Sequence, residues 1–148
     1  MTGFLTPLQV EEVEDTSHDG RGTWRVLSPL VYESGQAAQT FRVPAGFITD
    51  FASVPRIPVA FWLLGDTAHA AAVLHDYLYT THEVSKDMSD AVLREAAKSV
   101  GVPAWKSWLL WMGVKIGGRG PWTRDGQPQP ARVVNQMELS HEDPADRA

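Results

Sequence analysis

The chain has 148 residues, of which 43% are apolar, so it is long enough to form one domain around a hydrophobic core. It contains no cysteine, which excludes disulfides, thiolate nucleophiles and cysteine-ligated zinc. The formal net charge of −5 argues against a nucleic-acid partner, because such partners favour a basic surface.

The start of the chain has neither a basic region nor a long apolar run, so we expect no signal peptide. Residues 23–34 carry β-branched and aromatic side chains interrupted by proline, which predicts short strands. Two more strand-like runs follow at 40–43 and 47–51, separated by Pro44 and Gly46. The N-terminal half therefore predicts a small antiparallel sheet.

Helical patterns fill the second half of the chain. The first covers roughly 68–81, with Asp66 or Thr67 as its N-cap. The second covers roughly 86–100, with Ser85 as its N-cap. Strands followed by helices are typical of an α+β fold, in which the sheet packs on about three helices.

A third helix is expected to begin near Pro103 and to end before Gly118. It is apolar but too short to span a bilayer and contains two lysines, so we expect no transmembrane segment. Few apolar residues follow it. We therefore expect a single α+β domain over 1–122 and an extended or disordered tail over 123–148.

A histidine and several carboxylates interrupt the apolar pattern of residues 70–93. His75 and Tyr79 share a helix face because they are four residues apart, and the second helix could bring Asp90 or Asp87 against the imidazole. A neutral histidine held by a carboxylate can act as a general base. Asp76, the adjacent carboxylate, could bind calcium or another divalent cation.

The same residues also fit a purely structural interpretation. Buried polar groups usually bond to one another: His75 to a backbone carbonyl, Asp76 to a helix end, and Asp90 to Arg94 at i,i+4. Spacing alone favours this polar seam in the core. The convergence of several titratable groups favours the reactive site, because such sites shift pKa values.

Residues 47–58 form a second polar cluster in an apolar segment. In the functional interpretation Asp50 is a further metal ligand or an orienting acid for the helical site, and Ser53 is a polar contact, with Arg56 close behind in the same polar cluster. In the alternative interpretation this is a turn, in which Asp50 and Ser53 bond to backbone N–H groups and Arg56 pairs with Asp50.

The third helix is rich in tryptophan. Five large apolar residues form one stripe, and Trp111 lies off it; the stripe consists of Trp105, Trp108, Leu109, Met112 and Ile116. Such a stripe usually faces the core. The alternatives are a protein interface formed by Trp105, Trp108 and Trp111, or contact with a lipid surface.

Several separated motifs resemble a domain-of-unknown-function family found in tailed phages and prophages. That family is marked by T-D-x-A-S-V-P-R and H-D-x-L-Y, which match "TDFASVPR" and "HDYLY" here, and the resemblance covers roughly residues 40–122. It implies a phage or prophage origin, with no established activity.

A shorter resemblance concerns the chemistry. His75-Asp76-x-x-Tyr79 is similar to the H-D-x-x-Y signature of phospholipase A2 enzymes and of the phospholipase domain in parvovirus capsids. The resemblance implies that His75 is the base, Asp76 binds calcium, Asp90 orients the histidine and Tyr79 supports it. The glycine-rich calcium loop of those enzymes is missing ahead of this helix.

Three hypotheses follow. The first is a virion-associated structural or accessory component of a phage head or tail, which contacts other phage structural proteins and carries a His-Asp, hydrolase-like site. The second is a small metal-dependent hydrolase that acts on lipid or peptidoglycan when the phage enters or lyses a cell. The third is a host-directed binding protein. The expected location is the virion or the host cytoplasm.

Overall fold

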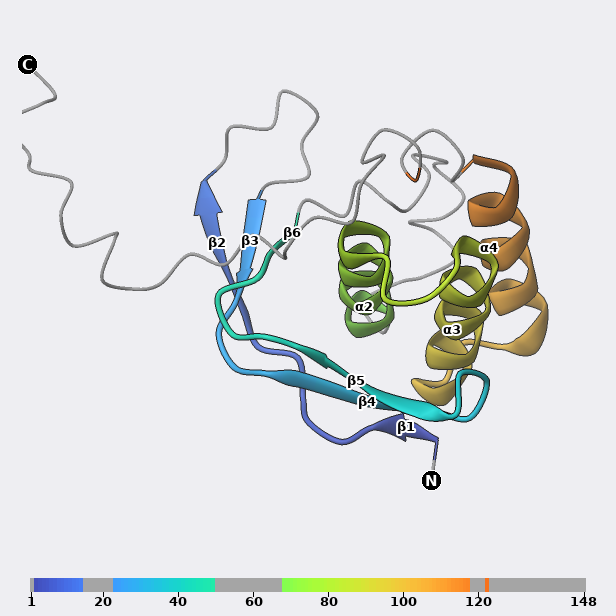
Figure 1. Ribbon diagram of the computed structural model, residues 1–148, viewed down its shortest axis with the longest axis horizontal. Coiled ribbons are helices and arrows are strands. Elements are labelled where there is room, and N and C mark those ends of the chain that lie inside the picture. Colours follow the sequence, from blue (N-terminus) through green and yellow to red (C-terminus); the bar gives the residue numbers. More distant parts are fainter. Residues whose placement is uncertain (1, 15–22, 50–67, 118–121, 123–148) are drawn as a thin grey trace, which may run out of the picture.

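The computed structural model describes residues 2–14, 23–49, 68–117 and 122, and within these ranges it contains short strands and three helices (Figure 1). The strands form two antiparallel sheets. One sheet has the order β1-β4-β5, with bounds Gly3–Phe4, Leu30–Ser34 and Gln39–Val43. The other has the order β2-β3-β6, with bounds Val10–Glu14, Thr23–Val26 and Ile48–Thr49.

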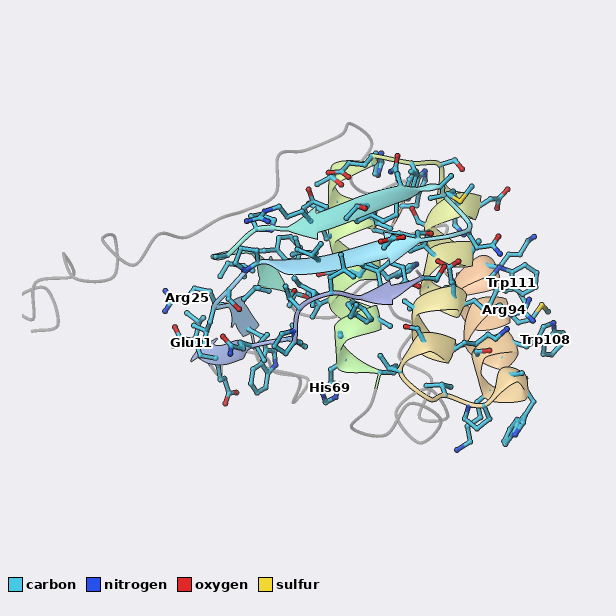
Figure 2. All side chains as sticks on the ribbon, turned by 90° about the horizontal axis from the view of Figure 1, so that it is seen from below. Glu11, Arg25, His69, Arg94, Trp108 and Trp111 are labelled. Carbon is cyan, nitrogen blue, oxygen red and sulfur yellow. The ribbon has the colours of Figure 1, made fainter. Side chains whose placement is uncertain are left out.

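The β4–β5 hairpin turns one face toward the helices. Its register pairs Leu30 with Val43 and Tyr32 with Phe41, and all four side chains are buried. Alternate residues of β4 between them are less buried, as expected for a strand with one covered face. In the second sheet, buried Arg25 of β3 pairs with Glu11 of β2 directly opposite it (Figure 2).

The three helices are α2 (His69–Thr81), α3 (Lys86–Ser99) and α4 (Ala104–Gly117). The hydroxyl oxygen of Ser85 accepts a hydrogen bond from the backbone N–H of Met88, which confirms Ser85 as the N-cap of α3. After α3 the chain turns at Gly101, whose φ of +94° favours glycine because other residues are strained there.

The helices form a layer in which α3 packs between α2 and α4, and the β4–β5 hairpin lies along one side of that layer (Figure 1). Helix α3 also contacts β1, and α2 contacts β6. The buried core joins Tyr32 and Phe41 of the hairpin to leucines and alanines of α2 and α3. This arrangement leaves the far side of α4 without a covering element among the described residues.

The predicted α+β class is confirmed, and the three helices lie close to their expected bounds. The sequence predicted one small antiparallel sheet from residue 23 onward, whereas the strands form two three-stranded sheets. Each sheet includes one strand that lies before residue 23, β1 in one and β2 in the other. The predicted N-cap of the first helix, Asp66 or Thr67, is wrong, because α2 begins at His69 and its N-cap is Ala68, which makes no side-chain capping hydrogen bond. The predicted tail over 123–148 lies outside the described residues. Among the residues that are described, no helix combines the length and apolar character needed to cross a membrane.

Candidate functional site

His75 of α2 and Asp90 of α3 meet between the two helices. The Nε2 atom of His75 lies 3.0 Å from Oδ1 of Asp90. Neither residue reaches solvent, since His75 is 0% and Asp90 is 1% exposed. The two helices therefore join at a buried polar pair, in the middle of an otherwise apolar contact.

Asp90 accepts two more hydrogen bonds. The hydroxyl of Tyr79 donates to Oδ1 at 2.6 Å, and Nζ of Lys86 donates to Oδ2 at 2.7 Å. The ring of Tyr79 also lies against the imidazole of His75, with ring centroids 4.1 Å apart. Together these four side chains form the His75–Asp90 network, in which both carboxylate oxygens are satisfied.

Burial and hydrogen bonding act in opposite directions on the charges of this network. Burial lowers the pKa of His75 from its ordinary value, although Asp90 works against that effect. Burial alone would raise the pKa of Asp90, but hydrogen bonds from His75, Lys86 and Tyr79 lower it overall. Burial and the adjacent Asp90 raise the pKa of Tyr79, which keeps its proton.

These directions define the protonation of the network at neutral pH. Asp90 is ionised and can only accept, so Nε2 of His75 must carry the hydrogen that it donates to Asp90. The neutral imidazole then has its lone pair on Nδ1. Chemically, the arrangement is a histidine held in one tautomer by a carboxylate, which is what a general base requires.

Asp76 follows His75 but points in another direction. It is half-buried, and its Oδ2 accepts a hydrogen bond of 2.6 Å from the hydroxyl of Thr49 on β6. A carboxylate is the type of ligand that calcium prefers. Within the described ranges, no group of three or more histidine or carboxylate side chains is arranged to hold a metal ion.

The other predicted polar residues are not part of this network. Asp87 is exposed in the first turn of α3, where its charge favours the helix N-terminus. Asp50, Ser53 and Arg56 lie outside the described residues. The predicted partner of Asp90 on its own helix was Arg94, but the structure places Lys86 there, one turn in the opposite direction.

Sequence reasoning missed three contributors to this region. Lys86 is one helical turn before Asp90, and that i,i+4 spacing was the available signal. Thr49 comes from a distant strand and gave no signal. Trp122 stacks on His82 with ring centroids 3.8 Å apart and meets the ring edge of Tyr79 at 5.1 Å, a contact between segments remote in sequence.

The predicted tryptophan stripe of α4 faces solvent. Its core-facing interpretation is wrong, because Trp105 is 57% and Trp108 is 44% exposed. Leu110 and Val114 are buried against α3 instead, on the opposite side of the helix. Figure 2 shows Trp108 and Trp111 on the outer side of the helix layer, near Arg94.

Comparison with known families gives one match. A family model described as "Protein of unknown function (DUF1353)" matches residues 24–114, a range that includes β4, β5 and β6, β3 from its second residue, and the helices that form the His75–Asp90 network. No curated protein and no solved structure matches the chain.

Proposed function

The chain belongs to the DUF1353 family, and on that premise we propose that it is a virion-associated component of a tailed phage or prophage that carries a His-Asp hydrolase site. The phage assignment is supported by the motifs "TDFASVPR" and "HDYLY". The hydrolase assignment depends on a single observation, the hydrogen bond between Nε2 of His75 and the ionised carboxylate of Asp90.

In this proposal the network prepares His75 to take a proton from water. Asp90 fixes the tautomer and would stabilise the imidazolium that forms when Nδ1 accepts the proton. Tyr79 and Lys86 hold the carboxylate in place through both of its oxygens. The lowered pKa of His75 keeps the imidazole neutral, and therefore able to accept a proton, at physiological pH.

Asp76 and Asp50 are the proposed ligands for calcium or another divalent cation, which when bound would polarise the carbonyl of an ester or amide substrate. Thr49 orients Asp76 by donating to Oδ2. The proposed substrates are phospholipid or peptidoglycan, encountered when the particle enters or lyses a cell. Because His75 is fully buried, the proposal requires the site to open when it meets its substrate.

The second candidate function is that of a structural component of the phage particle without catalytic activity. In that case the His75–Asp90 network only stabilises the fold. This reading is favoured by the zero exposure of His75 and by the complete satisfaction of Asp90. A network without exposed groups fixes how α2 packs on α3. Attachment to other phage proteins would then fall to the exposed tryptophans of α4.

The decisive experiment measures hydrolysis by the purified full chain, on phospholipid vesicles and on peptidoglycan, with and without calcium. We expect activity that falls by at least about a hundredfold in His75→Ala, the typical contribution of a general base. Asp76→Asn should lower the activity and the response to calcium together. Asp87→Asn is the matched control, because Asp87 lies on α3 but outside the network.

Folding of every variant is checked by circular dichroism. Lack of activity in the folded wild type on both substrates would contradict the hydrolase site. Quantitative mass spectrometry of purified particles tests the virion assignment separately: a copy number that matches head or tail symmetry supports it. Absence from particles would instead favour a host-directed binding protein.

A further inference from the structure

Helix α4 is apolar on two opposite sides, and within the described ranges only one of them is covered. Leu110 and Val114 pack against α3. On the other side, large apolar side chains face solvent: Trp105 at 57%, Trp108 at 44%, Leu109 at 39% and Ile116 at 71%. An exposed apolar patch of this kind marks an interaction surface.

The charged side chains of α4 are all positive. The helix contains Lys106 and Lys115 and no acidic residue. Nζ of Lys106 lies 5.5 Å from the ring centroid of Trp105, and Nζ of Lys115 lies 4.7 Å from that of Trp111. A chain with a formal net charge of −5 therefore presents a locally cationic, aromatic face.

A groove of about 660 Å³ lies along α3, and Trp111 forms its border with α4. Thr2 and, from the β4–β5 turn, Gln36 complete its lining. The guanidinium carbon of Arg94 lies 5.8 Å from the ring centroid of Trp111, and Figure 2 shows both side chains on the same side of the helix layer. The Nε atom of Arg94 is buried without a hydrogen-bond partner in the described structure. Lys98 and Trp111 line the same groove.

The acidic residue of the groove is already engaged. The carboxylate of Glu95 accepts hydrogen bonds from Tyr32 at 3.1 Å, from Ser34 at 2.8 Å and from the backbone N–H of Gln36 at 2.9 Å. Glu95 therefore has partners other than Arg94 and Lys98, and these two cations can bind an anion from outside the chain. A guanidinium and an ammonium together suit a phosphate group.

We infer that the outer face of α4, with the Arg94–Lys98 groove, docks on an anionic lipid bilayer. Tryptophan and lysine along one helix face suit the headgroup region of a membrane, where the rings enter the interface and the ammonium groups reach the phosphates. The stripe from Trp105 to Ile116 extends roughly 16 Å along the axis, so α4 would lie flat on the surface.

Charge complementarity decides between this occupant and a second copy of the chain. Pairing of two α4 faces around a twofold axis would bring the lysines of one copy against those of the other. An anionic bilayer instead offers a charge opposite to every cation on this face.

The inference is independent of the proposed hydrolase site, since no residue of the His75–Asp90 network belongs to the docking face. His75→Ala is therefore expected to bind vesicles as well as the wild type does. Loss of hydrolysis with retained binding would contradict neither proposal. Retained hydrolysis of soluble substrate with no vesicle binding would overturn only the docking face.

The test is co-sedimentation of the full chain with vesicles of phosphatidylglycerol and phosphatidylcholine, compared with vesicles of phosphatidylcholine alone. We expect the wild type to prefer the anionic vesicles at least about tenfold, because each cation near such a surface adds roughly fivefold. The double variant Trp105→Ser/Trp108→Ser should lose at least about tenfold in binding. Arg94→Gln should lose about fivefold.

Matched controls lie elsewhere on the surface. Leu5 is 56% and Leu27 is 43% exposed, so Leu5→Ser/Leu27→Ser removes apolar side chains of similar exposure to Trp105 and Trp108. Arg42→Gln removes an exposed cation from β5 and is the control for Arg94→Gln. Both controls should bind anionic vesicles as the wild type does.

A measurement on the wild type alone guards against misfolded variants. Brominated anionic lipids should quench tryptophan fluorescence, because the α4 rings would lie at headgroup depth. Absence of quenching or of vesicle binding in the folded wild type would overturn the inference. So would a dimer in solution that Trp105→Ser/Trp108→Ser dissociates, because the face would then belong to a second copy.

Discussion

Nε2 of His75 and Oδ1 of Asp90 lie 3.0 Å apart although the residues are 15 positions apart in the sequence. This one contact joins α2 to α3 through a polar pair that solvent does not reach. The other two side chains of the His75–Asp90 network also come from these helices. Tyr79 is one helical turn from His75 on α2, and Lys86 is one turn from Asp90 on α3. Stability and proposed chemistry therefore depend on the same carboxylate.

Asp90→Ala should destabilise the protein strongly. The substitution leaves His75, Tyr79 and Lys86 without their shared acceptor, and breaking a buried ion pair costs about 3–5 kcal/mol. Urea denaturation would measure the change in the free energy of unfolding. Asp87→Ala, three residues earlier and exposed, should cost less than about 1 kcal/mol, the value of a charge at a helix N-terminus. Equal losses in the two variants would argue against the network.

Stability should fall as the pH is lowered below the ordinary histidine pKa of 6.5. Burial lowers the pKa of His75 in the folded chain, so the unfolded chain binds more protons in this range. The free energy of unfolding should then decrease by up to about 1.4 kcal/mol per pH unit. The pKa of Asp90 is lowered too, and its contribution is lost below its ordinary value of 3.8.

Thermal unfolding between pH 7 and pH 5 would test this dependence. His75→Gln should flatten it, because the variant has no group at that position that titrates in the interval. A slope that is unchanged in His75→Gln would assign the effect to another group.

Neighbouring leucines of α4 should respond very differently to truncation. Leu110 is 3% exposed and packs in the core, so Leu110→Ala should cost about 2–5 kcal/mol. Leu109 is 39% exposed on the outer face, and Leu109→Ala should change stability by less than about 1 kcal/mol. Chemical denaturation of both variants measures the difference. A reversed order would place the opposite face of α4 in the core.

Glu95→Ala should loosen the contact between α3 and the β4–β5 hairpin. Tyr32, Ser34 and the backbone of Gln36 all donate to this carboxylate, and hydrogen bonds to a charged group contribute about 1.5–3 kcal/mol each. We expect a loss of at least about 2 kcal/mol in urea denaturation. Lys98→Ala, exposed near the end of the same helix, should cost less than about 1 kcal/mol.

Much of the fold follows from local sequence patterns. Ser85 marks the start of α3 because its hydroxyl can accept from a free backbone N–H, and Gly101 marks the chain reversal after it because glycine tolerates a positive φ. Such signals involve neighbouring residues only. The β1 strand escaped prediction because it has two residues and pairs with β4, far along the chain. The β2 strand pairs with the next strand, β3, but three of its five residues are glutamates, which are depleted in strands.

For the candidate site, the sequence determined that His75 and Tyr79 share a helix face, since periodicity fixes that relationship. Only the tertiary structure decided that Asp90 rather than Asp87 meets the imidazole, and that Thr49 bonds to Asp76. The tertiary structure also decided which side of α4 faces the core. Both of its sides are apolar, so periodicity could not choose between them, and the packing of Leu110 and Val114 against α3 left the tryptophans outside.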